Sequence, residues 1–199
     1  MNEFWNTRYS SPIYAYGTQP NAFFSECLQP LKPGRMLLPA EGEGRNAVYA
    51  AQQGWAVDAF DFSEAARDKA LQLAGGACVS IRYNISTLQD FTVPENTYDL
   101  IGLVYVHMPP AERSAFHQRL ISWLKPSGRI VLEAFHKEQL GRNSGGPQNS
   151  DMLYSRTELL QDFKGLDILQ LEEVYTDLDE GPFHHGTACV LRMVATLPV

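Results

Sequence analysis

The chain has 199 residues, of which 44% are hydrophobic and 20% are charged, and its formal net charge is -7 at pH 7. These proportions are typical of a globular protein that is long enough to bury a substantial core, so we expect one domain over residues 1–199. The negative charge argues against a nucleic-acid partner, because nucleic-acid phosphates attract basic surfaces.

Strands and helices are expected to alternate along the first half of the chain. Short apolar runs between turn residues predict strands, and apolar positions with a period of 3.6 predict helices. In chain order, the expected elements are helix 20–29, strand 35–39, helix 46–53, strand 55–60, a helix capped by Ser63 that ends at Gly75-Gly76, and strand 79–83.

The second half continues this alternation and then changes to a β-rich end. Ser155 and Glu158 form a capping box, which marks the start of a late helix. In chain order, the expected elements are strand 98–106, a helix opened by Pro109-Pro110, a turn at 125–128, strand 129–135, strand 167–174, a turn at 179–182 and strand 187–195.

This pattern predicts an α/β fold with a doubly wound (Rossmann-like), seven-stranded, mostly parallel sheet and an antiparallel C-terminal hairpin. Within the single domain, residues 1–30 are expected to form an N-terminal lid and helix. Residues 35–135 are expected to form the cofactor-binding core, and residues 165–196 the terminal hairpin.

The stretch 36–47, Met-Leu-Leu-Pro-Ala-Glu-Gly-Glu-Gly-Arg-Asn-Ala, is typical of a nucleotide-type cofactor site. Gly42 and Gly44 permit a tight turn and a close backbone approach to a ligand. A helix opening at Arg45 is expected to aim free N–H groups at that ligand. Asp61 follows the next strand, where an acid accepts hydrogen bonds from ribose hydroxyls.

Two cofactors are compatible with this turn. The spacing also reads as GxGxxA, which is found in nicotinamide-dependent oxidoreductases, and these bind a pyrophosphate at the helix N-terminus. Glu41 and Glu43 stand in the turn, with Arg45 in partial compensation, and would repel a pyrophosphate. S-adenosylmethionine has no phosphate and carries a sulfonium and an ammonium group, so the acidic turn favours it. An NAD-dependent oxidoreductase and a non-catalytic S-adenosylmethionine-binding module are the alternatives.

Six motifs taken together resemble the class I S-adenosylmethionine-dependent methyltransferases, in particular the small bacterial enzymes of the tellurite-resistance-like group. Each motif is weak alone, and their order and spacing carry the resemblance over essentially the whole chain. They are Trp5-x-x-Arg8-Tyr9, Tyr14-x-Tyr16-Gly17-x-x-Pro20-Asn21, Ala40-Glu-Gly-Glu-Gly-Arg-Asn46, His107-Met-Pro-Pro110, Gly145-Gly-Pro147 and Glu180-Gly-x-x-His184-x-Gly186.

The resemblance implies a role for each part of the site. The glycine turn would hold the methionine part, Asp61 the ribose and Phe62 the adenine face, while Asn84-Ile85-Ser86 would meet the adenine edge. The end of the fourth strand, from Tyr105 to His107, would border the transferable methyl group. The resulting candidates are, for catalysis, His107, His184 and Tyr16, and, for cofactor binding, Trp5, Arg8, Tyr9, Ala40, Glu41, Gly42, Gly44, Asn46, Asp61, Phe62, Asn84, Ile85, Ser86 and Tyr105.

Two positions depart from the wider superfamily. Its acidic residue near the end of strand one falls on Leu38, and the first glycine of its motif falls on Ala40. The contact to the cofactor's ammonium group then passes to Glu41 or to a backbone carbonyl, and the sequence does not decide between these two.

The aromatic residues before the first strand have two compatible interpretations. Trp5, Tyr9, Tyr14 and Tyr16 can pack on the core, and they can also form a lid over the sulfonium, whose charge is attracted to aromatic faces. Arg8 either holds a carboxylate of the cofactor or substrate, or is a surface cation.

The histidines divide into two groups. His107 precedes Pro109-Pro110 at the carboxyl end of a buried strand, and His184 lies just past the hairpin turn, so both are candidates for the substrate side. His117 and His136 are expected at the surface. We predict no metal ligands, because His184 has no partner at a plausible spacing.

The acceptor is expected to be a small molecule: a thiol, an oxyanion of a chalcogen, or a small metabolite. A thiol hardly needs a general base, whereas an alcohol does. Cys27, Cys78 and Cys189 form no CxxC pattern, so we predict reduced thiols. Since no signal peptide or membrane-spanning segment is evident, we predict a cytoplasmic protein with no membrane partner.

Overall fold

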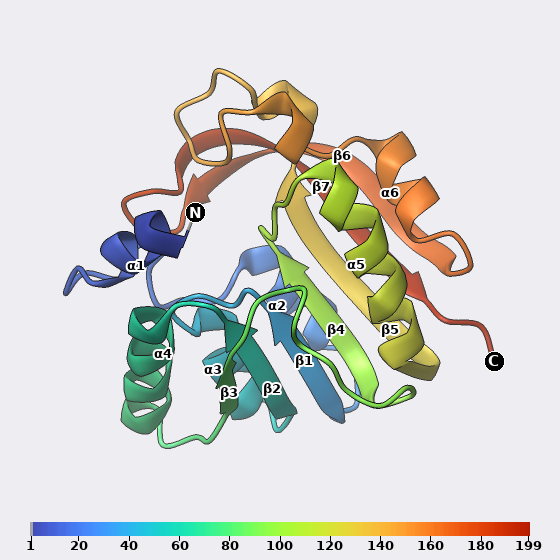
Figure 1. Ribbon diagram of the computed structural model, residues 1–199, viewed down its shortest axis with the longest axis horizontal. Helices are drawn as coiled ribbons and strands as arrows, with labels where there is room; N and C mark the ends of the chain where they lie inside the picture. Colours follow the sequence, from blue (N-terminus) through green and yellow to red (C-terminus); the bar gives the residue numbers. More distant parts are fainter. Residues whose placement is uncertain (1) are drawn as a thin grey trace. The chain divides into compact units, whose positions relative to one another are not determined.

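The computed structural model describes residues 2–199 and contains one seven-stranded sheet with the strand order β3-β2-β1-β4-β5-β7-β6 (Figure 1). The strands are β1 (Arg35–Pro39), β2 (Ala56–Asp61), β3 (Arg82–Ile85), β4 (Tyr98–Val104), β5 (Leu124–Phe135), β6 (Asp167–Asp179) and β7 (His185–Thr196). The helices are α1 (Asn2–Tyr9), α2 (Ala22–Leu28), α3 (Arg45–Gln52), α4 (Glu64–Gly76), α5 (Pro110–Trp123) and α6 (Arg156–Asp162), with 3-10 turns η1 (Lys137–Gln139) and η2 (Ser150–Met152).

The fold is the predicted one: a mostly parallel α/β sheet with an antiparallel C-terminal hairpin. The chain forms two compact units. The N-terminal unit holds the residues up to Thr92 together with Glu180–Phe183, and the C-terminal unit holds Val93–Asp179 and His184–Val199. The extent of a single functional domain over residues 1–199 stays a prediction.

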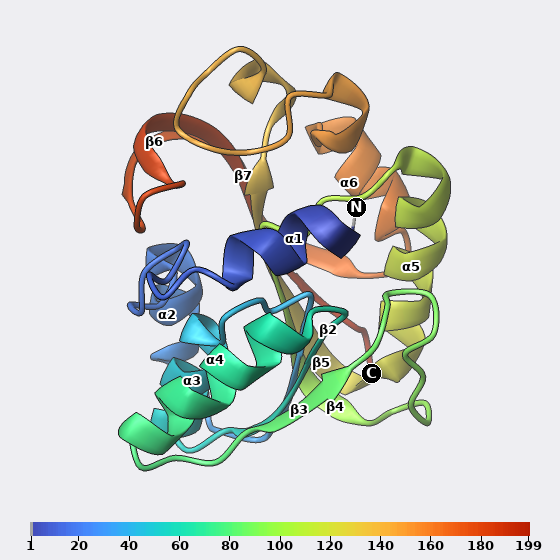
Figure 2. The same cartoon turned by 60° about the vertical axis from the view of Figure 1, so that its left-hand side comes forward.

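In the N-terminal unit, β1 pairs in parallel with β2, and β2 pairs in parallel with β3. Helix α4 presents an alanine face to the strands, because Ala66, Ala70 and Ala74 are buried. Ser63 caps this helix by accepting a hydrogen bond from the Ala66 N–H at 3.2 Å, as the sequence predicts. Helix α1 packs against α4 (Figure 2).

Strand β3 begins three residues later than the sequence pattern predicts. The end of α4 explains the shift, because the Val79 N–H donates to the Ala74 carbonyl and the Cys78 N–H donates to the Gly75 carbonyl. Cys78 has a φ of 55°, which places it in the left-handed region that ends helices. The residues expected to start the strand therefore close the helix.

In the C-terminal unit, β4 and β5 are parallel, and β7 lies antiparallel between β5 and β6. The predicted turn at 125–128 is a break in the pairing of β5 with β4, since Tyr98 pairs with Leu124 and Leu100 pairs with Arg129. The capping box at the start of α6 is present, with both of its hydrogen bonds.

The expectation that His117 and His136 lie at the surface is wrong. His117 is fully buried, and its Nδ1 lies 3.0 Å from Asp162 Oδ2, because α6 packs on the face of α5 that carries it. His136 follows β5 directly and is 9% exposed. Among residues 2–199, no helix is both long and apolar enough to cross a membrane.

Candidate cofactor and catalytic residues

The turn between β1 and α3 has a left-handed backbone at three positions: φ is 47° at Ala40, 63° at Gly42 and 86° at Gly44. A Cβ at Gly44 would lie 2.5 Å from Ala70 Cβ, so this glycine permits α3 to approach α4. A Cβ at Gly42 would lie 2.9 Å from the Tyr9 hydroxyl oxygen. Both glycines are therefore required by contacts within the N-terminal unit.

Glu41 occupies the N-terminus of α3. Its Oε1 accepts hydrogen bonds from the backbone N–H groups of Asn46 at 2.9 Å and Ala47 at 2.8 Å. The expectation that this helix offers free N–H groups to a ligand is corrected at these two positions, because a carboxylate already binds them. Burial raises the pKa of Glu41 to about 7, although the helix N–H groups and Arg45 oppose the shift.

Glu43 fastens the N-terminal segment to the turn. Its Oε2 accepts a hydrogen bond from the Ala15 N–H at 2.7 Å, and its Oε1 forms an ion pair with Lys69. The Lys69 ammonium also donates to the carbonyls of Ser11 and Ile13. Glu43 is thus engaged by the protein itself, a role that the sequence did not suggest.

Asp61 ends β2 beside the turn and is 4% exposed. Its Oδ2 accepts a hydrogen bond from the Gly42 N–H at 3.2 Å, and its Oδ1 accepts one from the Ser63 N–H at 2.9 Å. Burial raises its pKa, against the effect of these hydrogen bonds. The Tyr83 hydroxyl donates to the Gly42 carbonyl at 2.5 Å, so the turn is anchored from β2 and β3.

The candidates for adenine contact follow β2 and β3. Phe62 is partly buried, whereas Asn84 and Ile85 are exposed. The Ser86 N–H donates to the Asp61 carbonyl at 3.0 Å, which holds the end of β3 beside the end of β2. The structure therefore brings these candidates together with Asp61.

Helix α1 carries the aromatic candidates. Trp5 stacks on Tyr9 with ring centroids 5.5 Å apart, and Tyr16 lies 6.5 Å from Trp5. Tyr9 is buried, and its pKa is raised well above the usual value by that burial and by the charge of Asp61. Arg8 donates to the Tyr16 hydroxyl oxygen at 2.9 Å, and its guanidinium lies 4.2 Å from the Phe183 ring centroid.

A buried ion pair that the sequence did not reveal joins the turn to the residues between β6 and β7. Arg45 Nη2 lies 2.8 Å from Glu180 Oε2, and the Asn21 side chain donates to Glu180 Oε1 at 3.0 Å. Asn46 Oδ1 in turn accepts from the Asn21 N–H at 2.9 Å. Glu180 is the first residue of the motif Glu180-Gly-x-x-His184-x-Gly186, which marks it as a candidate. The sequence does not show that Arg45 is its partner, because the two residues lie far apart along the chain.

In the C-terminal unit, Tyr105, Phe135 and His184 form an aromatic cluster. The His184 ring meets the Tyr105 and Phe135 rings edge-on, at centroid distances of 4.5 and 5.3 Å. The Tyr105 hydroxyl donates to the buried Glu133 carboxylate at 2.7 Å, and Arg192 binds the other oxygen of Glu133. Tyr105 has a φ of 55°, a left-handed conformation that is uncommon for residues other than glycine.

Both ring nitrogens of His107 are bonded to the backbone. Nε2 accepts from the Phe135 N–H at 3.1 Å, so Nδ1 carries the proton and donates to the Met152 carbonyl at 2.7 Å. Burial lowers the pKa of His107 to about 4. In this arrangement the imidazole is neutral and has no lone pair directed at a substrate.

The described candidates thus form two groups. The N-terminal unit collects the following residues around the turn: Trp5, Arg8, Tyr9, Tyr16, Ala40, Glu41, Gly42, Gly44, Asn46, Asp61, Phe62, Asn84, Ile85 and Ser86. The C-terminal unit holds Tyr105, His107 and His184.

Comparison with known proteins finds one matching family and several structures of similar fold. Residues 39–128 match a family described as a methyltransferase domain. No curated protein matches the sequence. A structure from work on the conversion of a disulfide bond into a thioacetal group during echinomycin biosynthesis is 15% identical, with a TM-score of 0.81, and the alignment covers 100% of this chain and 92% of that one.

Two further solved structures are similar. TehB from Haemophilus influenzae is 14% identical with a TM-score of 0.74, over 98% of this chain and 66% of that one. The 1,6-didemethyltoxoflavin-N1-methyltransferase from Burkholderia thailandensis, solved with 1,6-didemethyltoxoflavin and S-adenosylhomocysteine, is 19% identical with a TM-score of 0.68, over 88% and 76%.

At these identities the similar structures show the fold alone, a Rossmann-like α/β fold with an antiparallel C-terminal hairpin. The matched segment contains the turn, Asp61 and strand β2. Residues 39–128 thus match a methyltransferase-domain family, and the structures of similar fold include a methyltransferase solved with S-adenosylhomocysteine.

Proposed function

We propose that the protein transfers the methyl group of S-adenosylmethionine to a small-molecule acceptor. The observation that carries this proposal is the position of Glu41, whose carboxylate binds the N–H groups of Asn46 and Ala47 at the start of α3. A pyrophosphate requires such N–H groups and is repelled by a carboxylate among them. A cofactor that has no phosphate and carries two positive groups fits the same position.

The residues around the turn fit this cofactor. Asp61 would accept hydrogen bonds from the ribose, Phe62 and Asn84 would meet the adenine, and Glu41 would face the ammonium group. The bound cofactor supplies an already activated methyl group, so the protein's main tasks are to position the acceptor and to exclude water. Trp5 and Tyr9 would contribute aromatic faces toward the sulfonium charge.

The two histidine candidates receive different roles. We assign His107 to positioning, because both of its ring nitrogens are bonded to the backbone. His184 and Tyr105 would form the wall that receives the acceptor, with Glu133 and Arg192 holding Tyr105 in place. Tyr16, held by Arg8, would complete the aromatic surface on α1 and the segment after it.

For the acceptor, we propose a thiol, a chalcogen oxyanion or another small metabolite, and a place in the tellurite-resistance-like group. The likeness to TehB supports the group, and the motifs Trp5-x-x-Arg8-Tyr9 and Glu180-Gly-x-x-His184 point to it as well. A soft lone pair on sulfur, selenium or tellurium attacks the methyl carbon without a general base, which suits a site whose His107 is neutral and saturated. We further propose a cytoplasmic location.

The test is calorimetric titration of the purified protein with S-adenosylmethionine, S-adenosylhomocysteine and NADH. We expect micromolar binding of the first two and none of NADH. The Asp61→Asn variant should lose this binding, whereas Asp68→Asn, an exposed residue on α4, should retain it. Binding of NADH alone would overturn the proposal.

Turnover distinguishes an enzyme from a cofactor-binding module. The protein would be incubated with S-adenosylmethionine and a panel of thiols, selenite and tellurite, and S-adenosylhomocysteine would be measured. Cofactor binding without product on any acceptor would favour the non-catalytic module.

A further inference from the structure

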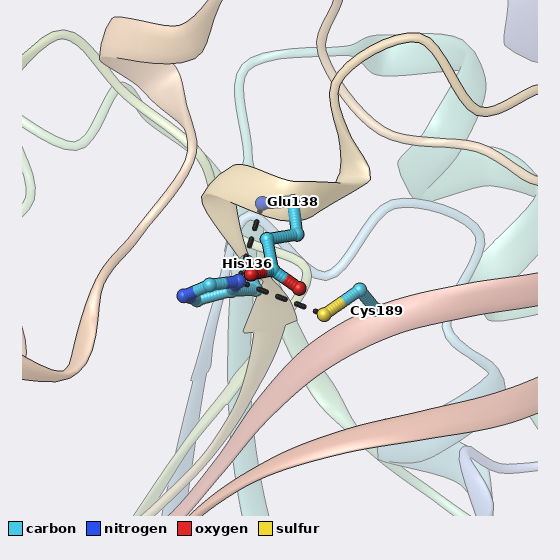
Figure 3. A group of neighbouring side chains, drawn as sticks. All are labelled: His136, Glu138 and Cys189. Carbon is cyan, nitrogen blue, oxygen red and sulfur yellow. Dashed lines mark hydrogen bonds between the residues drawn. The ribbon is translucent and has the colours of Figure 1, made fainter.

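A cluster of potential metal ligands lies at the junction of β5, η1 and β7 (Figure 3). It consists of His136 and Glu138, which follow β5, and Cys189 on β7. One ligand atom from each residue lies within 4.8 Å of the other two. All three belong to the C-terminal unit, and the proposed reaction uses none of them.

The spacing of the nitrogen and sulfur atoms suits a tetrahedral metal. His136 Nδ1 lies 3.6 Å from Cys189 Sγ. With zinc–nitrogen bonds of about 2.0 Å and zinc–sulfur bonds of about 2.3 Å, tetrahedral geometry places these atoms roughly 3.5 Å apart. The thiol and the imidazole therefore need almost no movement to share an ion, while the exposed Glu138 side chain has room to adjust.

Two of the three ligands, His136 and Glu138, have a second residue beside them. Nδ1 of His136 accepts hydrogen bonds, so Nε2 carries the ring proton and points toward Glu173, whose Oε1 lies 3.9 Å away. Tyr175 donates to Glu138 Oε2 at 2.5 Å and holds that carboxylate. A histidine whose other nitrogen faces a carboxylate, and a ligand carboxylate that is itself hydrogen-bonded, are the arrangements that support bound metals in proteins.

The geometry points to a site for a divalent cation of the zinc class, bound by His136, Glu138 and Cys189 with a fourth position open to water. Binding breaks the S–H bond of Cys189, releases that proton to solvent and forms a sulfur–metal bond, with no change of oxidation state. The imidazole gives the lone pair that now accepts a 3.2 Å hydrogen bond from the Glu138 N–H. The Glu138 N–H gives up this acceptor when the metal binds.

The nature of the three donor atoms narrows the choice of ion. A thiolate, an imidazole and one carboxylate suit zinc and cobalt, whereas magnesium and calcium prefer oxygen ligands only. Bound metal would clamp η1 onto β7, where the His136 N–H already donates to the Cys189 carbonyl at 3.0 Å. Sequence patterns do not reveal this site, since Cys189 is far from His136 along the chain and no short spacing pattern links them.

The test is a titration with Co²⁺, whose bond to a thiolate gives a charge-transfer band in the near ultraviolet. The titrated protein would carry Cys27→Ser and Cys78→Ser, so that Cys189 is its remaining cysteine. We expect a band that saturates at one equivalent, disappears when Zn²⁺ is added in competition, and is absent after the further change Cys189→Ser.

Cys189 is buried, so its replacement can destabilise the protein. Variants of exposed residues therefore provide a test that does not depend on folding. Glu138→Gln should weaken Co²⁺ binding at least about tenfold, since loss of even an outer-shell partner costs about 10–100-fold. Glu173→Gln should weaken it less, and the neighbouring exposed Glu172→Gln should leave it unchanged. The absence of a thiolate band, or a Co²⁺ affinity unaltered by Glu138→Gln, would overturn the inference.

Discussion

The two units hold their candidate residues by different means. In the N-terminal unit, Glu41 and Asp61 each accept hydrogen bonds from backbone N–H groups, and Glu43 pairs with Lys69, so the residues proposed for the cofactor also build the turn. In the C-terminal unit, the acceptor-side candidates His184 and Tyr105 contact each other through edge-on ring packing, and Tyr105 is held by the side-chain carboxylate of Glu133. Substitutions in the first group should therefore affect folding and binding together, whereas substitutions in the second group should separate the two.

The largest loss of stability is expected when a buried carboxylate that pairs with an arginine is replaced. Each unit has such a pair: Arg113 with Asp162 in the C-terminal unit, and Arg45 with Glu180 in the N-terminal unit. Asp162→Asn removes the carboxylate that Arg113 contacts at 2.6 Å and His117 at 3.0 Å, and Arg113 keeps only a longer ion pair of 3.4 Å with Glu158. This should lower the free energy of unfolding by about 3–5 kcal/mol. Glu180→Gln in the N-terminal unit should cost only about 1–2 kcal/mol, because Arg45 still donates to the carbonyls of Tyr16 and Gln19.

Urea unfolding of the two variants measures this difference. The exposed Asp68→Asn serves as the control for a carboxylate lost from the surface, and it should change stability by less than about 0.5 kcal/mol. Equal losses for Asp162→Asn and Glu180→Gln would contradict the view that backbone carbonyls support Arg45.

The next largest loss of stability is expected for the substitution of Gly44. Gly44→Ala should lower the free energy of unfolding by about 2–4 kcal/mol, because φ is +86° and the new Cβ would lie 2.5 Å from Ala70 Cβ. Gly141→Ala in the C-terminal unit is the matched control, since φ is +82° there and a Cβ meets nothing within 4 Å. It should cost only the backbone strain of about 1 kcal/mol. Thermal unfolding of both variants tests whether contact with α4 accounts for the difference.

Glu41 should give the N-terminal unit a pH-dependent stability. Its pKa is about 7 in the folded protein against 4.5 for an ordinary glutamate, so the folded state binds more protons between these values. Stability therefore falls as the pH rises from about 4.5 to about 7, by about 2 kcal/mol once the partial exposure of the side chain is allowed for. The full contribution is present below pH 4.5.

The variant Glu41→Gln isolates this contribution, because glutamine does not titrate. The difference in unfolding free energy between parent and variant should change with pH inside that window and stay constant above it. The exposed Glu26→Gln should follow the parent throughout. A parent-minus-variant difference that is independent of pH would show that Glu41 has an ordinary pKa.

Much of the fold and part of the site could be predicted from local patterns. Strand β1 was predicted at 35–39 as observed, because a short apolar run between turn residues has few alternative structures. The capping box of Ser155 and Glu158 was found because both partners lie within one turn of helix. Local chemistry of this kind is visible in a single sequence.

Features that depend on distant partners could not be predicted. The burial of His117 depends on α6, which supplies Asp162, and the sequence did not show that the Glu41 carboxylate binds the N–H groups at the start of α3. The pairing of Arg45 with Glu180 joins residues that only the fold brings together. Burial and the free energy of a charge are properties of the tertiary structure, and helical periodicity gives no measure of them.

The smallest loss of stability is expected at Tyr105 and Tyr83. The Tyr105 hydroxyl donates to a carboxylate, and the Tyr83 hydroxyl donates to a backbone carbonyl. Tyr105→Phe should cost about 1 kcal/mol of stability, because Glu133 loses one hydrogen bond but keeps Arg192. Its affinity for S-adenosylmethionine should stay close to that of the parent. Tyr83→Phe should cost a similar free energy and also weaken cofactor binding, because its hydroxyl holds the Gly42 carbonyl of the turn. Calorimetry of the two variants therefore separates them, and equal cofactor affinities would show that the turn keeps its conformation without Tyr83.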